Sequence, residues 1–224
     1  VHLMTVHPLE SVSADEVETA VKIFREHHPD EKPFFSSIAL KEPDKSDVLG
    51  SKKISRVIEL TGVDQQADGG FASLVDVTEN KFITTTRLTL DAQVAYNVAD
   101  FGVAIILTKS NPEWLERVAA RGIDVSTEEA LALIQIDPWP AGGYAHESIP
   151  KRHRALRCIS FVKEDATDNG YARPIHGLIA HVDVTARTVT HIEDSGVIPM
   201  PTASGRYDAT SPSATRSDLK PLSI

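Results

Sequence analysis

The chain has 224 residues, of which 41% are hydrophobic and 25% are charged, close to the averages for globular proteins. Its formal net charge of −9, without a run of five or six like charges, argues against nucleic-acid binding, because phosphates need a clustered basic face. The densest basic stretch, Lys151 to Arg154, is short and typical of a solvated loop that leads into a strand.

Three further classes are disfavoured. The longest apolar stretches, such as residues 103–107, fall far short of the roughly 20 residues that a membrane helix needs. The single cysteine, Cys158, allows no intrachain disulfide and no thiolate metal cage, and its apolar neighbours predict a place in the core. No secretory signal is visible near the first residues, so we expect an intracellular protein, cytoplasmic or peroxisomal.

The first predicted unit, residues 5–90, begins with a helix over residues 14–27. Ser13 and Glu16 have the spacing of a capping box, in which each side chain accepts from the other residue's backbone N–H. Pro29 ends the helix. Strand-like runs separated by Gly, Asp and Pro follow at residues 34–40, 54–60, 71–77 and 81–88.

The second predicted unit, residues 91–198, repeats this order. A helix over residues 92–107 would place Val94, Val98, Phe101 and Ile105 along one stripe. A shorter helix follows, with its N-cap at Asn111, Pro112 at its first position and Gly122 past its end, and Ser126 to Glu129 offer a further capping box. The predicted strands are residues 133–136, 155–163, 178–184 and 188–193, the last two joined by a tight turn near Arg187.

The predicted fold class is therefore α+β, with two tandem small domains. Each is a helix packed on an antiparallel sheet of about four strands, a cystatin-like arrangement. Beyond the second unit the sequence is rich in Pro, Ser, Thr, Gly and Asp, and apolar residues no longer recur at helix or strand spacing. We expect residues 199–224 to be an extended linker towards a further domain.

A series of short sequences carries a family resemblance through its order along the chain. Its members are His7 to Leu9, Ile38 to Pro43, Ala119 to Asp124, Asp137 to Gly142, Tyr171 to Leu178, Gly196 to Pro201 and Asp218 to Leu222. Each is weak alone, but together they resemble copper-containing primary amine oxidases over residues 7–224. In that family two small helix-plus-sheet domains precede a large catalytic β-sandwich, so the resemblance implies the non-catalytic N-terminal part of a homodimeric enzyme.

The catalytic residues of that family find no match in this chain. The family forms topaquinone from the tyrosine of Asn-Tyr-Asp/Glu and binds copper through a His-x-His pair and a third histidine. The nearest sequence here, Ala95-Tyr96-Asn97, has the wrong order, and no two histidines are separated by one residue. We therefore expect no catalytic residue and no bound cofactor in this chain, with copper and topaquinone held by the complete enzyme.

The histidines offer a metal hypothesis of their own, because imidazole suits copper and zinc. His176, His181 and His191 lie on or near one predicted hairpin. However, His176 and His181 differ by an odd number, so on a regular strand they point to opposite faces. We therefore expect no metal-binding residues in this chain.

The resemblance also implies that this part of the chain helps to wall the channel that leads an amine to the quinone. Phe101, Pro138, Trp139 and Tyr171 match positions that line its mouth, where aromatic rings offer contact to an amine's carbon body and a π face to its ammonium. The structural alternative is a helix-core Phe101, an anchoring Trp139 and an ordinary surface Tyr171. Because prolines flank Trp139, we expect it in a loop and substantially exposed.

Two functions from different classes remain open. The first is a domain pair of an oxidase that converts a primary amine, oxygen and water into an aldehyde, ammonia and hydrogen peroxide. The second is a stand-alone, non-enzymatic binding or interaction module, which helix-on-sheet domains often are. An exposed apolar face on the second domain would favour the first, because a self-sufficient module should be polar all round.

Overall fold

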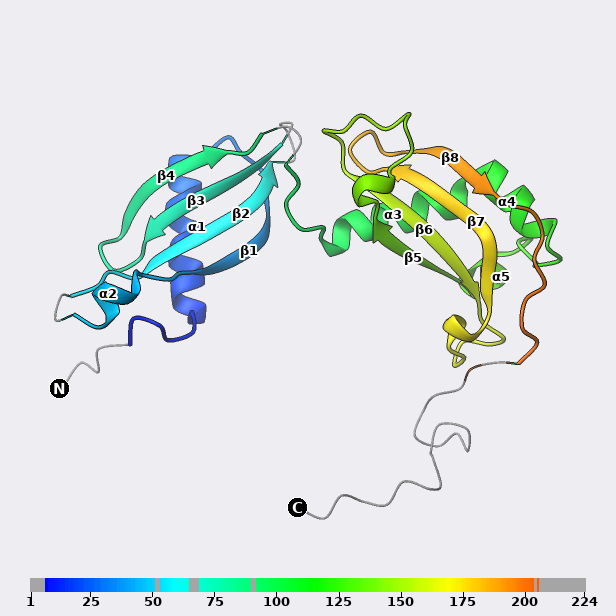
Figure 1. Ribbon diagram of the computed structural model, residues 1–224, viewed down its shortest axis with the longest axis horizontal. Helices are drawn as coiled ribbons and strands as arrows, with labels where there is room; N and C mark the ends of the chain where they lie inside the picture. The colour runs from blue at the N-terminus through cyan, green and yellow to red at the C-terminus, as the bar shows by residue number, and fades with distance from the viewer. Residues whose placement is uncertain (1–6, 51–52, 65–68, 90–91, 204, 206–224) are drawn as a thin grey trace, which may run out of the picture. The chain divides into compact units, whose positions relative to one another are not determined.

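The computed structural model describes residues 7–50, 53–64, 69–89, 92–203 and 205. The chain divides into two compact units, Val1–Asn97 and Val98–Ile224, and each contains a four-stranded antiparallel sheet with helices (Figure 1). This arrangement confirms the predicted α+β class. The predicted division between residues 90 and 91 lies outside the described residues.

Helix α1, Ala14–His27, has the predicted bounds, and its predicted N-terminal capping box is present. Glu16 donates its backbone N–H to Ser13 Oγ at 3.2 Å, and Ser13 N–H donates to Glu16 Oε2 at 2.9 Å, which completes the capping box. Ala20, Ile23 and Phe24 lie on one side of the helix and are buried against the sheet.

The first sheet has the order β1–β2–β3–β4: β1 Pro33–Lys41, β2 Val57–Asp64, β3 Gly70–Asp76 and β4 Lys81–Arg87. A single helical turn, α2 Lys45–Val48, lies between β1 and β2. Residues alternate between the two faces, so Ile58, Leu60, Phe71 and Val75 point to α1 and form the core.

Arg56, just before β2, fixes the segment that leads into α1. Its guanidinium donates to the Glu16 carboxylate and to the carbonyls of His7, Pro8, Glu10 and Ser11. Arg56 is 7% exposed, so this clamp is almost dry. The hydrogen bonds from Arg56 hold the pKa of Glu16 below its usual value.

The second unit starts with α3, Val98–Ser110, six residues later than predicted. The prediction of a helix from residue 92 was wrong because residues 92–97 remain with the first unit. Ser36 Oγ donates to the Ala95 carbonyl at 3.0 Å, and Val94 lies against Gly70 of β3.

Two shorter helices follow α3. The first, α4 Pro112–Ala119, is capped by Asn111 as predicted and buries Trp114 and Val118. The second, α5 Glu128–Ala132, is capped by Thr127, whose Oγ1 accepts from Ala130 N–H. The predicted capping box starting at Ser126 was therefore one residue early, since the Ser126 hydroxyl bonds to Asp124 instead.

The second sheet has the order β5–β6–β7–β8: β5 Ile134–Pro140, β6 Ala155–Val162, β7 Pro174–Asp183 and β8 Thr188–Asp194. Two short 3-10 turns, η1 Gly142–Tyr144 and η2 Gly170–Ala172, lie in the connections on either side of β6. Helix α3 packs across the strands, and α4 packs on β7 and β8 (Figure 1).

The buried side of α3 differs from the predicted stripe. Ala104 and Thr108 are fully buried, whereas Val98 of the predicted stripe is 84% exposed. Since α3 is apolar on all sides, periodicity alone could not choose the face that meets the sheet.

The predicted linker, residues 199–224, lies for the most part outside the described residues. Of it, Gly205 pairs with Asn169, whose N–H donates to the Gly205 carbonyl at 3.2 Å. The buried Asp168 carboxylate accepts from Gly205 N–H at 3.0 Å. Within the described part of the chain, no helix combines the length and apolar character needed to cross a membrane.

Candidate functional site

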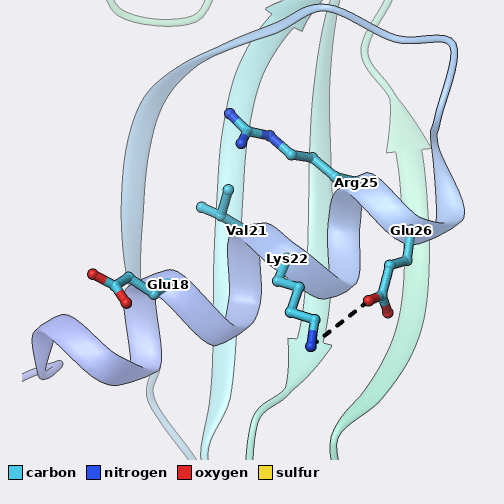
Figure 2. Close-up of a pocket in the computed structure, with 5 residues that line it drawn as sticks. All are labelled: Glu18, Val21, Lys22, Arg25 and Glu26. Carbon is cyan, nitrogen blue, oxygen red and sulfur yellow. Dashed lines mark ion pairs between the residues drawn. The ribbon is translucent and has the colours of Figure 1, made fainter.

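A shallow hollow lies on the outer side of α1 (Figure 2). It is lined by Glu18, Val21, Lys22, Arg25 and Glu26, all from the same helix. Lys22 and Glu26 form an ordinary i,i+4 ion pair at 3.9 Å, and both are exposed. Because no second element supplies converging groups, this hollow has the character of a solvated helix surface.

The second sheet offers a better candidate on the face opposite its helices. Residues paired across the strands point to the same side, and Trp139, Arg157, His181 and His191 form one such row across all four strands. The neighbouring row, from Pro138 through Cys158 and Ala180 to Ile192, faces the helices instead, and its last three members are buried. We call the side of the first row the open face.

Trp139 reaches the open face from a strand, so the predicted loop was wrong. Strand β5 continues to Pro140, with Trp139 opposite Arg157. Ala141 N–H donates to the Ala155 carbonyl, so Trp139, two residues earlier, also turns its backbone towards β6. Pro138 and Pro140 then turn their nitrogens away from β6, which an edge strand tolerates. The predicted exposure of Trp139 is confirmed at 57%.

Trp139 and Tyr171 converge on one carboxylate. Trp139 Nε1–H and Tyr171 Oη–H each donate to Asp137 Oδ2, both at 3.2 Å. Tyr171 lies on η2, where its backbone N–H donates to Asn169 Oδ1 at 3.0 Å, and its ring stands edge-on to Phe161 with a centroid distance of 4.9 Å. Tyr171 is 55% exposed.

The charge of Asp137 further favours the protonated form of the Tyr171 phenol. The nearby carboxylate raises the pKa of Tyr171 above its usual value, chiefly through Coulombic repulsion of a phenolate. Tyr171 therefore remains protonated at neutral pH and keeps its hydrogen-bond donor. Together Asp137, Trp139 and Tyr171 form what we call the aromatic–carboxylate cluster.

The other two predicted channel residues lie elsewhere. Pro138 belongs to the row that faces the helices, and Phe101 is half-buried on α3. The structure therefore brings together Trp139 and Tyr171, but not all four residues. Asp137 was missed as a site residue because a loop was predicted after residue 136, and only the continued strand places residues 137 and 139 on one face.

Three histidines also gather on the open face. His181 and His191 pair across β7 and β8, and the His146 ring stacks on His191 with a centroid distance of 4.1 Å. His181 Nε2 contacts Glu193 Oε2 at 3.1 Å, and Arg157 Nη2 contacts the same oxygen at 3.4 Å. Burial, the largest cause, lowers the pKa of His181, while the bond from His181 lowers the pKa of Glu193.

These histidines do not fit a copper site. Parallel stacking turns ring faces, not nitrogen lone pairs, towards one another. Across the described ranges, no group of three or more His, Cys, Asp or Glu side chains is arranged to hold a metal ion. His176 is exposed and is not one of the three histidines that meet on the open face.

Two predictions about single residues near the sheet have different outcomes. Cys158 is buried as predicted, and burial raises its pKa to about 11, so its thiol stays unreactive at neutral pH. Arg154 was predicted to be solvated but is 8% exposed and pairs with Asp100 of α3 at 2.5 Å. Arg154 therefore stabilises the packing of α3 on the sheet.

Comparison with known proteins adds a family match. A family model described as the copper amine oxidase N3 domain matches residues 99–211. The chain is 30% identical over 219 residues to a primary amine oxidase of Arthrobacter sp. (strain P1). This alignment covers 97% of this chain and 33% of the relative. It is 29% identical over 232 residues to a histamine oxidase of Arthrobacter globiformis, and this alignment covers 100% of this chain and 32% of the relative.

A plant relative and a solved structure extend the comparison. A peroxisomal copper-containing diamine oxidase 1 of Nicotiana tabacum is 26% identical over 272 residues, covering 98% of this chain and 33% of the relative. The crystal structure of a copper-containing benzylamine oxidase from Hansenula polymorpha superposes with a TM-score of 0.74 at 16% identity. That match covers 98% of this chain and 36% of the solved chain, and it shows the same fold. The chain spans about a third of the length of these curated relatives.

Proposed function

The chain belongs to the copper amine oxidase family, and we propose that it is the N-terminal, non-catalytic domain pair of a copper and topaquinone primary amine oxidase. Such an enzyme converts a primary amine, oxygen and water into an aldehyde, ammonia and hydrogen peroxide. The proposal is supported by the match to the N3 domain and by relatives that are about three times as long as this chain. The partners are then the catalytic part of the same enzyme and, in the assembled oxidase, a second copy.

One structural observation carries this proposal, an apolar surface on α3. Val98 is 84% and Ile106 68% exposed, and Ala99, Gly102 and Val103 complete the same side of the helix. We call these five residues the α3 stripe. A continuous apolar side on an exposed helix is typical of a surface that another protein part covers.

The α3 stripe favours the catalytic part of the oxidase as its occupant, because the relatives have two thirds of their length beyond the matched region. The alternative, a stand-alone binding or interaction module, would need a polar side on α3. The α3 stripe, from Val98 to Ile106, is instead apolar.

A second role concerns the substrate. We propose that Phe101, Pro138, Trp139 and Tyr171 contribute to the wall of the amine channel. The exposed rings of Trp139 and Tyr171 support this role, because both lie on the open face and neither fills the core. The relatives' names include a histamine oxidase and a diamine oxidase, so the family acts on more than one amine.

The cofactors would be held outside the described residues of this chain. Copper and topaquinone would supply the redox chemistry, and Tyr96 lacks the sequence context of a quinone precursor. Of the two proposed locations, peroxisomal or cytoplasmic, the first is supported by the tobacco relative, which is named as peroxisomal.

Substitutions in the α3 stripe test the proposal. In the 224-residue chain, Val98→Lys with Ile106→Lys should leave the melting temperature unchanged and reduce binding of a hydrophobic dye, because both side chains are exposed. In the full-length oxidase the same pair should weaken domain attachment by roughly 1.5–3 kcal/mol for each residue no longer buried.

The matched control is Leu49→Lys, since Leu49 is 77% exposed but lies outside the α3 stripe. It should change neither dye binding nor the stability of the oxidase. An oxidase that tolerates both lysines on α3 as well as it tolerates the Leu49→Lys control would contradict the proposed packing.

A further inference from the structure

We propose that the aromatic–carboxylate cluster of Asp137, Trp139 and Tyr171 is a binding subsite for a primary alkylammonium ion. The inference rests on the proposed function, because it places the charged end of an amine substrate at a defined point on the proposed channel wall. The contacts that form the subsite all lie within this chain.

The first argument is the unbalanced charge of Asp137. The described residues provide no lysine, arginine or histidine nitrogen that forms an ion pair with its half-buried carboxylate. Arg157, opposite Trp139, is engaged with Glu193 at 3.4 Å. A carboxylate on a partly apolar surface without a cation attracts one from solution.

The second argument is the set of groups around that carboxylate. Both aromatic donors bond to Oδ2, and Oδ1 accepts no hydrogen bond from the residues that the structure describes. An ammonium has three N–H donors and no acceptor, so it could donate to Oδ1. The rings of Trp139 and Tyr171, each more than half exposed, would lie beside the bound cation, while their N–H and O–H groups hold the carboxylate in place.

The third argument concerns the carbon body of the ligand. Ile159 lies opposite Asp137 in the sheet register, and Phe161 contacts the Tyr171 ring. Both are half-buried and apolar, so they form a floor for an alkyl chain next to the carboxylate. This combination selects a primary alkylammonium over a quaternary ammonium, which has no N–H to donate.

Nuclear magnetic resonance of the 224-residue chain tests the subsite directly. The chain has two tryptophans, so it gives two indole N–H signals, one from Trp139 at the subsite and one from the fully buried Trp114. Titration with n-butylammonium chloride at constant ionic strength should shift the Trp139 signal saturably, with a dissociation constant on the order of 1–10 mM. The Trp114 signal should not move.

Two carboxylate variants provide the comparison. Asp137→Asn should weaken binding by about tenfold or more, because it removes a charge-assisted hydrogen bond. Glu193→Gln should leave it within about twofold, since that carboxylate is already engaged by His181 and Arg157. Tetramethylammonium should bind several-fold more weakly than n-butylammonium.

The subsite would be refuted if sodium chloride produced the same shift, or if Asp137→Asn bound as tightly as the wild type. An unchanged Trp114 signal verifies that each variant is folded. If Asp137→Asn did not fold, Trp139→Leu would serve instead, with several-fold weaker binding expected by calorimetry. Binding together with a failed α3 test would keep the subsite and refute the proposed packing of this domain pair on the oxidase, and the reverse result would refute the subsite alone.

Discussion

Single residues on the open face owe their exposure to the position of β5 at the edge of the sheet. Trp139 occupies a strand position whose neighbours on both sides are prolines, and its indole stands 57% exposed. Trp114, the other tryptophan, is fully buried under α4. The same substitution, tryptophan to alanine, can therefore be made once at an exposed position and once in the core, and its effects on activity and on stability can be compared.

Replacing Trp139 with alanine in the full-length oxidase should change kcat/KM for bulky amines more than for methylamine. A channel wall contacts large substrates and supports no core, so the melting temperature should change little. Trp114→Ala is the control and should lose roughly 3–5 kcal/mol of stability without altering amine selectivity. A large loss of stability in Trp139→Ala with unchanged selectivity would refute the channel role.

Arg56 is a second residue whose role can be measured. Arg56→Leu would remove the cation that pairs with the Glu16 carboxylate and the guanidinium donors to the carbonyls of residues 7, 8, 10 and 11. Since breaking a buried pair strands a charge, we expect a loss of roughly 3–5 kcal/mol from the first unit in calorimetry. Arg25→Leu, on the exposed side of α1, should stay within about 0.5 kcal/mol, and equal losses in both variants would contradict the clamp.

At the scale of elements, the hairpin of β7 and β8 gathers groups that respond to pH. His181 is 5% exposed, and it faces Glu193, Arg157, His191 and His146. Its folded pKa is lowered, chiefly by burial. The unfolded chain therefore takes up the proton first as the pH falls.

The sign of the pH effect follows from this shift. The stability contributed by neutral His181 is fully present above its unfolded pKa of about 6.5 and is lost as the pH falls from there towards the lowered folded pKa. Thermal unfolding between about pH 7.5 and 5 should show this loss, and His181→Gln should reduce the slope. His176→Gln on the same strand is the matched control, because it makes the same substitution at an exposed side chain that does not touch His181 or Glu193.

At the scale of the whole molecule, the two units repeat one plan, a helix packed on a four-stranded antiparallel sheet. They differ in how completely their helices are covered. Helix α1 has a charged outer side, whereas α3 carries the α3 stripe. The second unit is therefore the one that we expect to be covered by another part of the oxidase.

Copper loading tests whether this chain binds copper or forms the quinone without the rest of the enzyme. After aerobic incubation with copper and dialysis, elemental analysis of the 224-residue chain should find well below one copper per chain, and a quinone stain should be negative. Among the residues that the structure describes, no three His, Cys, Asp or Glu side chains are arranged to hold one ion. One tightly bound copper per chain would contradict this assignment.

The sequence by itself determined the elements whose signals are local. The start of α1 follows from Ser13 and Glu16, and the start of α4 follows from Asn111 and Pro112, because caps act within one turn. The antiparallel pairing of β7 and β8 follows from a short connection that only a hairpin can use. The family resemblance was equally local, since it rested on short sequences in order.

Only the tertiary structure decided which side of α3 is buried, where that helix begins and which side chains meet at Asp137. These outcomes depend on contacts between residues far apart in the sequence, such as Ser36 with Ala95, Arg154 with Asp100 and Tyr171 with Asp137. Apolar residues are spread around α3, so their spacing gives no preferred side, and the sheet selects one by packing. The exposed place of Trp139 was predictable from its prolines, but its strand was not, because an edge position is a property of the whole sheet.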